Sequence, residues 1–141
     1  FMVYRLCPEM DIMLVVHFTL LSGFVTLIRE LIKDGEDRDG DSSVKARTLA
    51  VVLSTKVYNF IIYLFILFTL SFLVILLYYE RSYLHQPLIW VYYGYHFLFV
   101  IIPLYKAAID VRFAKQREDY TLLSRWLKYC FFTGILSILF F

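Results

Sequence analysis

The stretch VYNFIIYLFILFTLSFLVILLYY, residues 57–79, runs for 23 residues without a charged side chain. A helix needs about 20 mainly apolar residues to cross the hydrocarbon core of a bilayer, which is about 30 Å thick. Because this stretch is long enough and uncharged, it predicts a transmembrane helix. The rest of the sequence is therefore interpreted as that of a membrane protein.

The composition of the 141-residue chain supports the same interpretation. Hydrophobic residues make up 61% of it and charged residues 18%, whereas soluble domains average about 45–50% apolar and about 25% charged. One soluble core of this size could not bury so much apolar surface, and disordered chains are poor in such residues. The net charge of +2 gives no sign of a nucleic-acid partner. The expected partner is the lipid bilayer.

Three further apolar stretches flank the first one. Residues 12–28 and 88–105 are each long enough to span a membrane. The last uncharged run, 129–141, would reach only about 20 Å as a helix, so we expect a shortened fourth helix over residues 126–141. The sequence thus predicts an all-α, integral membrane bundle with about four transmembrane helices.

Basic residues are concentrated in two of the three segments between these spans. Segments 29–56 and 106–128 each contain six Lys or Arg residues, whereas segment 80–87 contains only Arg81. Loops rich in Lys and Arg stay on the cytoplasmic side, which predicts that both long loops are cytoplasmic, in an inner or plasma membrane. Apolar residues within 107–129 recur roughly at helical spacing and predict an amphipathic helix on the membrane surface.

The first of these loops begins with the run RELIKDGEDRDGD, residues 29–41, which contains six acidic residues. If the preceding helix continues through it, Glu30, Asp34, Asp37 and Asp41 fall within a stripe about 60° wide. Like charges on one helix face repel by a few tenths of a kcal/mol per pair. We therefore expect a bound cation to offset this repulsion.

Three interpretations of the acidic run remain to be compared. It can be a solvated loop without a ligand. A calcium-binding EF-hand loop starting at Asp37 fails, because Ser42 replaces the required Gly and Thr48 replaces the required Glu. Magnesium fits better, since it takes one or two carboxylates together with phosphate oxygens. Basic residues that could bind the remaining phosphate charge flank the run at Arg29, Lys33, Lys45 and Arg47.

The acidic run and the residues after it resemble the second aspartate-rich motif of the UbiA superfamily of intramembrane prenyltransferases, in the pattern Arg29-Glu30-x-x-Lys33-Asp34-x-x-Asp37-x-x-x-Asp41 followed by Arg47-Thr48-Leu49. By this resemblance, residues 1–141 form the C-terminal part of a single prenyltransferase domain. The four apolar stretches then correspond to the last four helices of a nine-helix bundle. Lys45 and Ala50 depart from the family's usual pattern, which has Gly and Pro at these positions.

The resemblance implies Mg²⁺-dependent transfer of a prenyl group from an isoprenoid diphosphate to an aromatic or other lipid-soluble acceptor. It assigns Asp37 and Asp41 as catalytic aspartates that hold the metal, with Asp34 as a further metal ligand. Lys33 and Arg47 are the implied substrate contacts. A bound metal neutralises a leaving diphosphate, and a dry pocket with aromatic walls stabilises a carbocation and excludes water.

The family's first aspartate motif, NxxxDxxxD, does not occur in these 141 residues. We therefore expect a longer protein whose N-terminal helices supply that motif, and we expect this part to be inactive alone. The alternative is a non-enzymatic membrane protein, such as a channel or transporter subunit, whose acidic loop collects cations. An aspartate motif between two apolar helices upstream of Phe1 would discriminate between these hypotheses.

Several polar residues within the spans have structural interpretations. His17 and His96 lie inside apolar stretches, where we expect hydrogen bonds between helices. Tyr58, Asn59 and Tyr63 begin the second span beside the acidic loop, and they either face a pocket or pack at the membrane interface.

Overall fold

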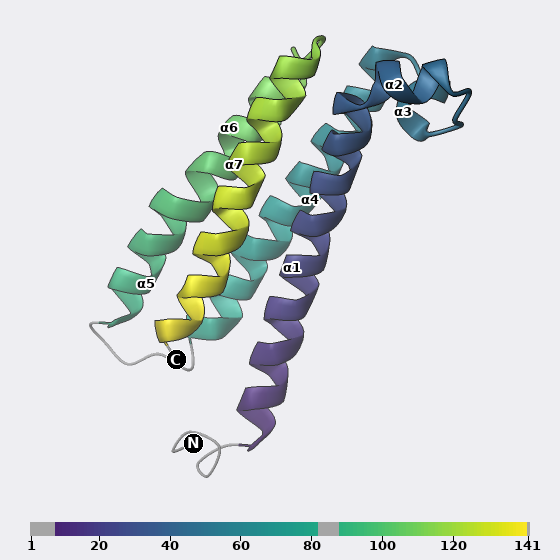
Figure 1. The fold of residues 1–141 in the computed structure, drawn as a ribbon. Coiled ribbons are helices and arrows are strands. Elements are labelled where there is room, and N and C mark those ends of the chain that lie inside the picture. The colour runs from purple at the N-terminus through teal and green to yellow at the C-terminus, as the bar shows by residue number, and fades with distance from the viewer. Residues whose placement is uncertain (1–7, 82–87, 141) are drawn as a thin grey trace.

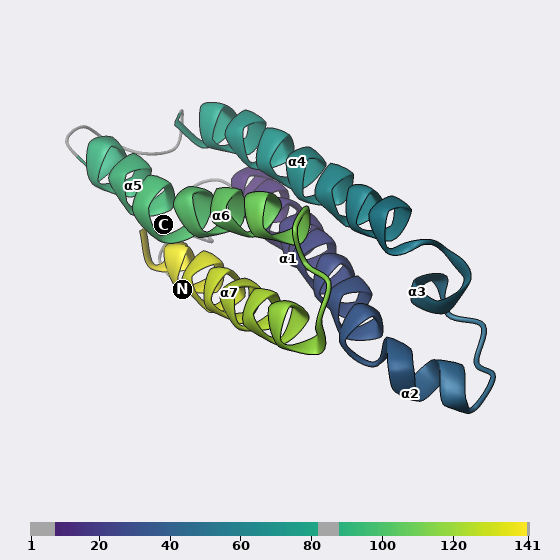
Figure 2. The same ribbon diagram turned by 90° about the horizontal axis from the view of Figure 1, so that it is seen from above.

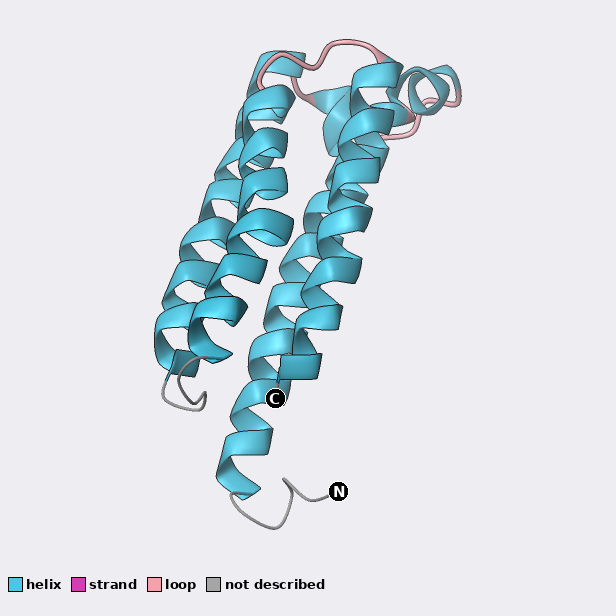
Figure 3. Ribbon diagram, turned by 90° about the vertical axis from the view of Figure 1, so that its left-hand side faces the viewer, coloured by secondary structure: helices cyan, strands magenta, loops and turns pink. Residues whose placement is uncertain are grey.

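Four long helices of the computed structural model lie side by side and run alternately in opposite directions (Figures 1 and 3). The structure describes residues 8–81 and 88–140, and every long element within them is helical. Each of the four is long and apolar enough to cross a membrane, so the predicted all-α bundle is confirmed. The helices are α1 (Pro8–Glu36), α4 (Thr55–Glu80), a third helix formed by α5 (Leu88–His96), the π-helical turn η3 (Phe97–Ile101) and α6 (Ile102–Val111), and α7 (Arg117–Leu136) with the 3₁₀ turn η4 (Ser137–Phe140).

Each long helix packs against two neighbours, as in a four-helix bundle. Helices α1 and α6 both contact α4 and α7, and α1 packs most extensively against α7 (Figure 2). Two short helices, α2 (Arg38–Ser43) and α3 (Leu49–Val52), lie at the end of the bundle where α1 finishes (Figure 1). The connection between α6 and α7 lies at the same end, so the structure brings the two long basic segments together.

The core of the bundle is apolar, and so is its outer surface. Side chains such as Ile28, Ile62 and Leu127 are fully buried between the helices. Large apolar side chains also cover the outside, and Phe132 and Trp90 are 64% and 69% exposed. Soluble proteins rarely expose such extensive apolar surface, whereas lipid chains solvate it.

The last two helices extend further than the sequence predicted. Helix α6 ends at Val111 and α7 begins at Arg117, so the predicted loop over 106–128 is reduced to five residues. The predicted amphipathic surface helix over 107–129 is therefore wrong, and the fourth helix is not short. The reason is that charged residues continue α7 on its outer face, while Leu123 and Leu127 stay buried on its inner face.

Pro103 interrupts the hydrogen-bond ladder in the middle of the third helix. Proline has no N–H to donate to the carbonyl four residues earlier, which here belongs to Phe99. The Thr133 hydroxyl of α7 lies 3.0 Å from that carbonyl and equally 3.0 Å from the Tyr129 carbonyl of its own helix, and Tyr95 donates to the Thr133 carbonyl at 2.8 Å. Because backbone groups inside a bilayer need partners within the protein, this exchange allows the π-helical turn η3 to exist at membrane depth.

Candidate functional site

Helix α1 continues beyond its apolar part and carries the first half of the acidic run. It ends at Glu36, and Asp37 joins it to α2 almost without a break. The Asp37 N–H donates to the Lys33 carbonyl at 2.9 Å, and the Asp37 carbonyl accepts from the Asp41 N–H at 2.9 Å. Helical spacing is therefore maintained from Glu30 to Asp41.

This spacing places the carboxylates of the acidic stripe on one face of the helix. The Asp34 carboxylate is repelled by those of Asp41, Glu30 and Asp37, and Lys33 offsets only part of that repulsion. Asp37 is exposed, while Asp34 and Asp41 are partly buried. In the part of the chain that the structure describes, no hydrogen bond or ion pair engages these three carboxylates. They are therefore available to a ligand.

The same carboxylates can supply only part of a metal site. Among residues 8–81 and 88–140, no group of three or more His, Cys, Asp or Glu side chains could hold a metal ion by itself. Magnesium usually takes one or two carboxylates and completes its shell with water and phosphate oxygens. Asp37 and Asp41 fit that smaller contribution, and their role as metal ligands stays a prediction.

The short helix α2 ends in a Schellman motif at Lys45. The Ala46 N–H donates to the Asp41 carbonyl at 2.9 Å, and the Lys45 N–H donates to the Ser42 carbonyl at 3.2 Å. Lys45 has a φ of +58°, in the left-handed region that favours glycine. The sequence resemblance expects Gly at this position, and the left-handed conformation of Lys45 is one that glycine adopts without strain.

Arg38 fixes α2 to the start of α4. Its guanidinium donates to the Leu53 carbonyl at 2.8 Å and also to the Thr55 hydroxyl. Sequence reasoning missed this residue, because a single Arg within an acidic run has no distinguishing pattern. Its effect is to hold the second half of the acidic run close to the bundle.

Gly35 lets α1 pass between two tyrosine rings at the same end of the bundle. A Cβ at this position would lie 2.8 Å from the Tyr120 ring and 3.1 Å from the Tyr58 ring. The Tyr58 hydroxyl donates to the Leu31 carbonyl. The Tyr120 hydroxyl donates to Asn59 Oδ1 at 2.7 Å. These contacts clamp the end of α1 between α4 and α7.

The same contacts explain the positions of the polar residues at the start of α4. Asn59 Nδ2 donates to the Ala114 carbonyl at 2.7 Å, and both Tyr58 and Asn59 are buried. The Arg112 guanidinium lies 5.3 Å from the centroid of the Tyr63 ring. All three residues therefore serve packing and anchoring, which was one of the two interpretations left open by the sequence.

A polar cleft of about 320 Å³ opens beside the acidic run. Lys33 and Arg47, the substrate contacts implied by the resemblance, are exposed and do not line it. The predicted metal ligands Asp34, Asp37 and Asp41 do not line it either, and its acidic residues are Glu36, Asp39 and Glu118. Its basic residues are Arg38, Lys115 and Arg117. The signal that could have found them was the charge of the two long loops, once both were placed at one end of the bundle.

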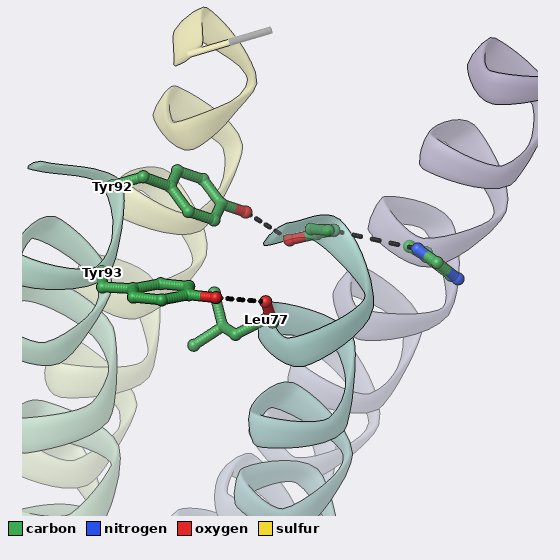
Figure 4. A network of polar contacts seen from close by, with 5 residues as sticks. Leu77, Tyr92 and Tyr93 are labelled. Carbon is green, nitrogen blue, oxygen red and sulfur yellow. Dashed lines mark hydrogen bonds and ion pairs between the residues drawn. The ribbon is translucent and has the colours of Figure 1, made fainter. Parts of the chain in front are cut away.

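A second polar cluster is buried near the opposite end. Glu80 is 4% exposed and accepts a hydrogen bond from the Tyr92 hydroxyl, and His17 Nδ1 of α1 lies 3.8 Å from its carboxylate. Tyr93 donates to the Leu77 carbonyl at 3.1 Å beside it (Figure 4). The expected hydrogen bond from His17 to another helix is not observed, because its Nδ1 is buried without a hydrogen-bond partner among the described residues and reaches Glu80 only at ion-pair distance. Glu80 was missed because it ends an apolar run, where sequence alone suggests exposure.

His96 belongs to the same region of the bundle. It is 2% exposed, and its Nδ1 lies 3.1 Å from the Tyr92 carbonyl within its own helix. Its ring centroid lies 4.3 Å from that of Tyr92. The expected hydrogen bond from His96 to another helix is therefore not observed among the described contacts. The contacts of Glu80 and Tyr92 give this cluster a structural role that joins α4 and α5.

Comparison with protein-family models, with curated proteins and with solved structures finds no match to this chain.

Proposed function

We propose that the chain forms the C-terminal part of a UbiA-type prenyltransferase and supplies the second of its two aspartate motifs. The proposed reaction is Mg²⁺-dependent transfer of a prenyl group from an isoprenoid diphosphate to an aromatic or other lipid-soluble acceptor. The observation that carries this proposal is the acidic stripe, which continues a helix of membrane-spanning length and presents carboxylates without protein partners.

The chemistry assigned to these residues follows from their positions. Asp37 and Asp41, with help from Asp34, would hold Mg²⁺, which neutralises the diphosphate as it leaves. Arg38, Lys115 and Arg117 line a cleft at the same end of the bundle, where guanidinium and ammonium groups can bind phosphate oxygens. Lys33 and Arg47 lie at the rim of this end of the bundle and remain candidates for the incoming substrates.

The clamp around Gly35 has a function in this proposal. Catalytic groups need to be fixed within a fraction of an ångström for electrostatic stabilisation to be effective. Tyr58 and Tyr120 fix the end of α1, and Arg38 fixes the segment that follows. The carboxylates are thereby presented by a rigid support at the end of the bundle that we assign to the cytoplasmic side.

Asp110 offers a control for testing the proposal. It lies near the end of α6, outside both the acidic stripe and the polar cleft. In the whole protein, Asp37→Asn should lower Mg²⁺-dependent prenyl transfer by at least about 100-fold, the scale of losing one electrostatic stabiliser. Transfer of a radiolabelled isoprenoid diphosphate into membrane lipids measures this loss.

Asp110→Asn should keep transfer close to the unaltered level in the same assay. Circular dichroism and gel filtration check that both variants remain folded. Transfer that is unchanged by Asp37→Asn would exclude Asp37 as a metal ligand, and a complete lack of transfer by the unaltered protein would exclude the enzyme assignment and favour a cation-collecting membrane protein.

A further inference from the structure

A groove of about 340 Å³ runs along the outer surface between α1 and α7. It shares no lining residue with the polar cleft at the end of the bundle. On both helices, the basic residues of the groove lie one turn closer than its apolar residues to the end of the bundle that carries the acidic stripe. On α1 the spacing is from Val25 to Arg29, and on α7 it is from Lys128 to Phe132. The lining consists of Val25, Thr26, Arg29, Lys128, Phe131 and Phe132.

A side-chain hydrogen bond shows that the two basic residues lie at the same height. The Thr121 hydroxyl donates to Glu36 Oε1 at 2.8 Å and fixes the register of α7 against α1. Arg29 precedes Glu36 by seven residues, and Lys128 follows Thr121 by seven. Because the two helices are antiparallel, both basic residues lie about 10 Å below this contact.

That height coincides with the start of the apolar part of the bundle. Tyr58, near the beginning of the uncharged stretch of α4, donates to the Leu31 carbonyl. Arg29 lies two residues, or about 3 Å, closer than Leu31 to the N-terminus of α1. The charged ends of Arg29 and Lys128 can therefore extend to the boundary between lipid headgroups and hydrocarbon.

The basic residues of the groove can bind a further anion. Arg29 Nη1 pairs with Glu30 at 3.1 Å, but its Nε is buried without a hydrogen-bond partner. Lys128 forms no ion pair with any residue that the structure describes. One basic residue of the groove is thus paired with a carboxylate and the other has no ion pair with a described residue, next to an apolar surface, and this arrangement is complementary to a molecule with an anionic head and an apolar tail.

We propose that this groove binds an anionic phospholipid from the leaflet at the acidic end of the bundle. Its phosphate lies between Arg29 and Lys128, and an acyl chain extends along Phe131 and Phe132. This site is separate from the proposed prenyl-transfer site and does not depend on it.

Native mass spectrometry of the whole protein tests the site with phosphatidylglycerol and phosphatidylcholine of identical acyl chains. The unaltered protein should retain phosphatidylglycerol in preference to phosphatidylcholine. Lys128→Gln and Arg29→Gln should each weaken phosphatidylglycerol retention about fivefold, as expected for one surface charge near lipid. Lys56→Gln, an exposed charge on α4 outside the groove, should leave retention unchanged.

Equal retention of the two lipids would overturn the proposal, as would equal losses in Lys128→Gln and Lys56→Gln. Because Arg29 is partly buried, its replacement can disturb folding. Lys128 is exposed, so the Lys128→Gln result decides the outcome alone if the Arg29 variant does not fold.

Discussion

At the scale of single residues, Lys45 is the clearest place where sequence and backbone disagree. Its left-handed conformation closes α2, and this conformation costs an L-residue with a Cβ about 1–2 kcal/mol. Glycine removes that strain, although it gives back part of the gain through greater freedom in the unfolded chain. Lys45→Gly should therefore raise the free energy of unfolding by roughly 0.5–1 kcal/mol.

Unfolding by SDS titration in mixed micelles measures this change. Lys45→Ala is the control, since alanine keeps the Cβ and should leave stability nearly unchanged. Destabilisation by Lys45→Gly would show that the Lys45 side chain, rather than the backbone conformation, matters at this position.

At the scale of elements, the interrupted third helix depends on its contact with α7. The Thr133 hydroxyl lies within hydrogen-bond distance of the Phe99 carbonyl, to which Pro103 has no N–H to donate. Thr133→Val should cost about 1 kcal/mol of unfolding free energy, within the range of hydrogen bonds between membrane helices. In a Pro103→Ala background the loss should be smaller, because residue 103 can then donate to Phe99 itself.

A double-mutant cycle in the same micelles measures this coupling between Thr133 and Pro103. An equal cost of Thr133→Val in both backgrounds would mean that the hydroxyl does not replace the missing backbone donor.

The elements also show what could and could not be predicted from the sequence. The spans over 57–79 and 88–105 were recognisable because apolar runs of that length have one common use. The start of α7 and the end of α1 could not be recognised in the same way, because charged residues on the outward face of a helix resemble loop residues in a hydropathy profile. Contacts such as those of Arg38 and Glu80 depend on which helices become neighbours, and this information is not local in the sequence.

At the scale of the whole molecule, the bundle places residues 37–54 and 112–116 at one end and the end of α4 at the other (Figure 1). Combined with the excess of Lys and Arg in the long segments, this predicts that both connections are cytoplasmic. Single cysteines at Ser43, Lys115 and Arg81, introduced after replacing Cys7 and Cys130 by Ser, can report the side of each connection.

An impermeant maleimide applied to intact cells should label only Arg81→Cys, and permeabilisation should expose Ser43→Cys and Lys115→Cys together. Labelling of Ser43→Cys and Lys115→Cys from opposite sides would contradict the four-helix arrangement. Labelling of both from outside would instead reverse the predicted orientation.

The candidate site was predictable in its acidic half and not in its basic half. The spacing of Asp34, Asp37 and Asp41 depends only on a short, continuous helical segment, and the structure has such a segment at these residues. Lys115 and Arg117 join Arg38 only because α7 packs against α1. The prenyltransferase proposal therefore depends on the aspartates first and on the neighbouring cleft second.

Binding of Mn²⁺, which prefers the same oxygen ligands as Mg²⁺, tests the central claim most directly. Electron paramagnetic resonance can measure it on the whole protein with an unreactive isoprenoid diphosphate analogue. Asp37→Asn and Asp41→Asn should each weaken Mn²⁺ binding by at least about tenfold, whereas Asp110→Asn should bind as the unaltered protein does. Equal Mn²⁺ affinity in all four proteins would contradict the assignment of these aspartates as metal ligands.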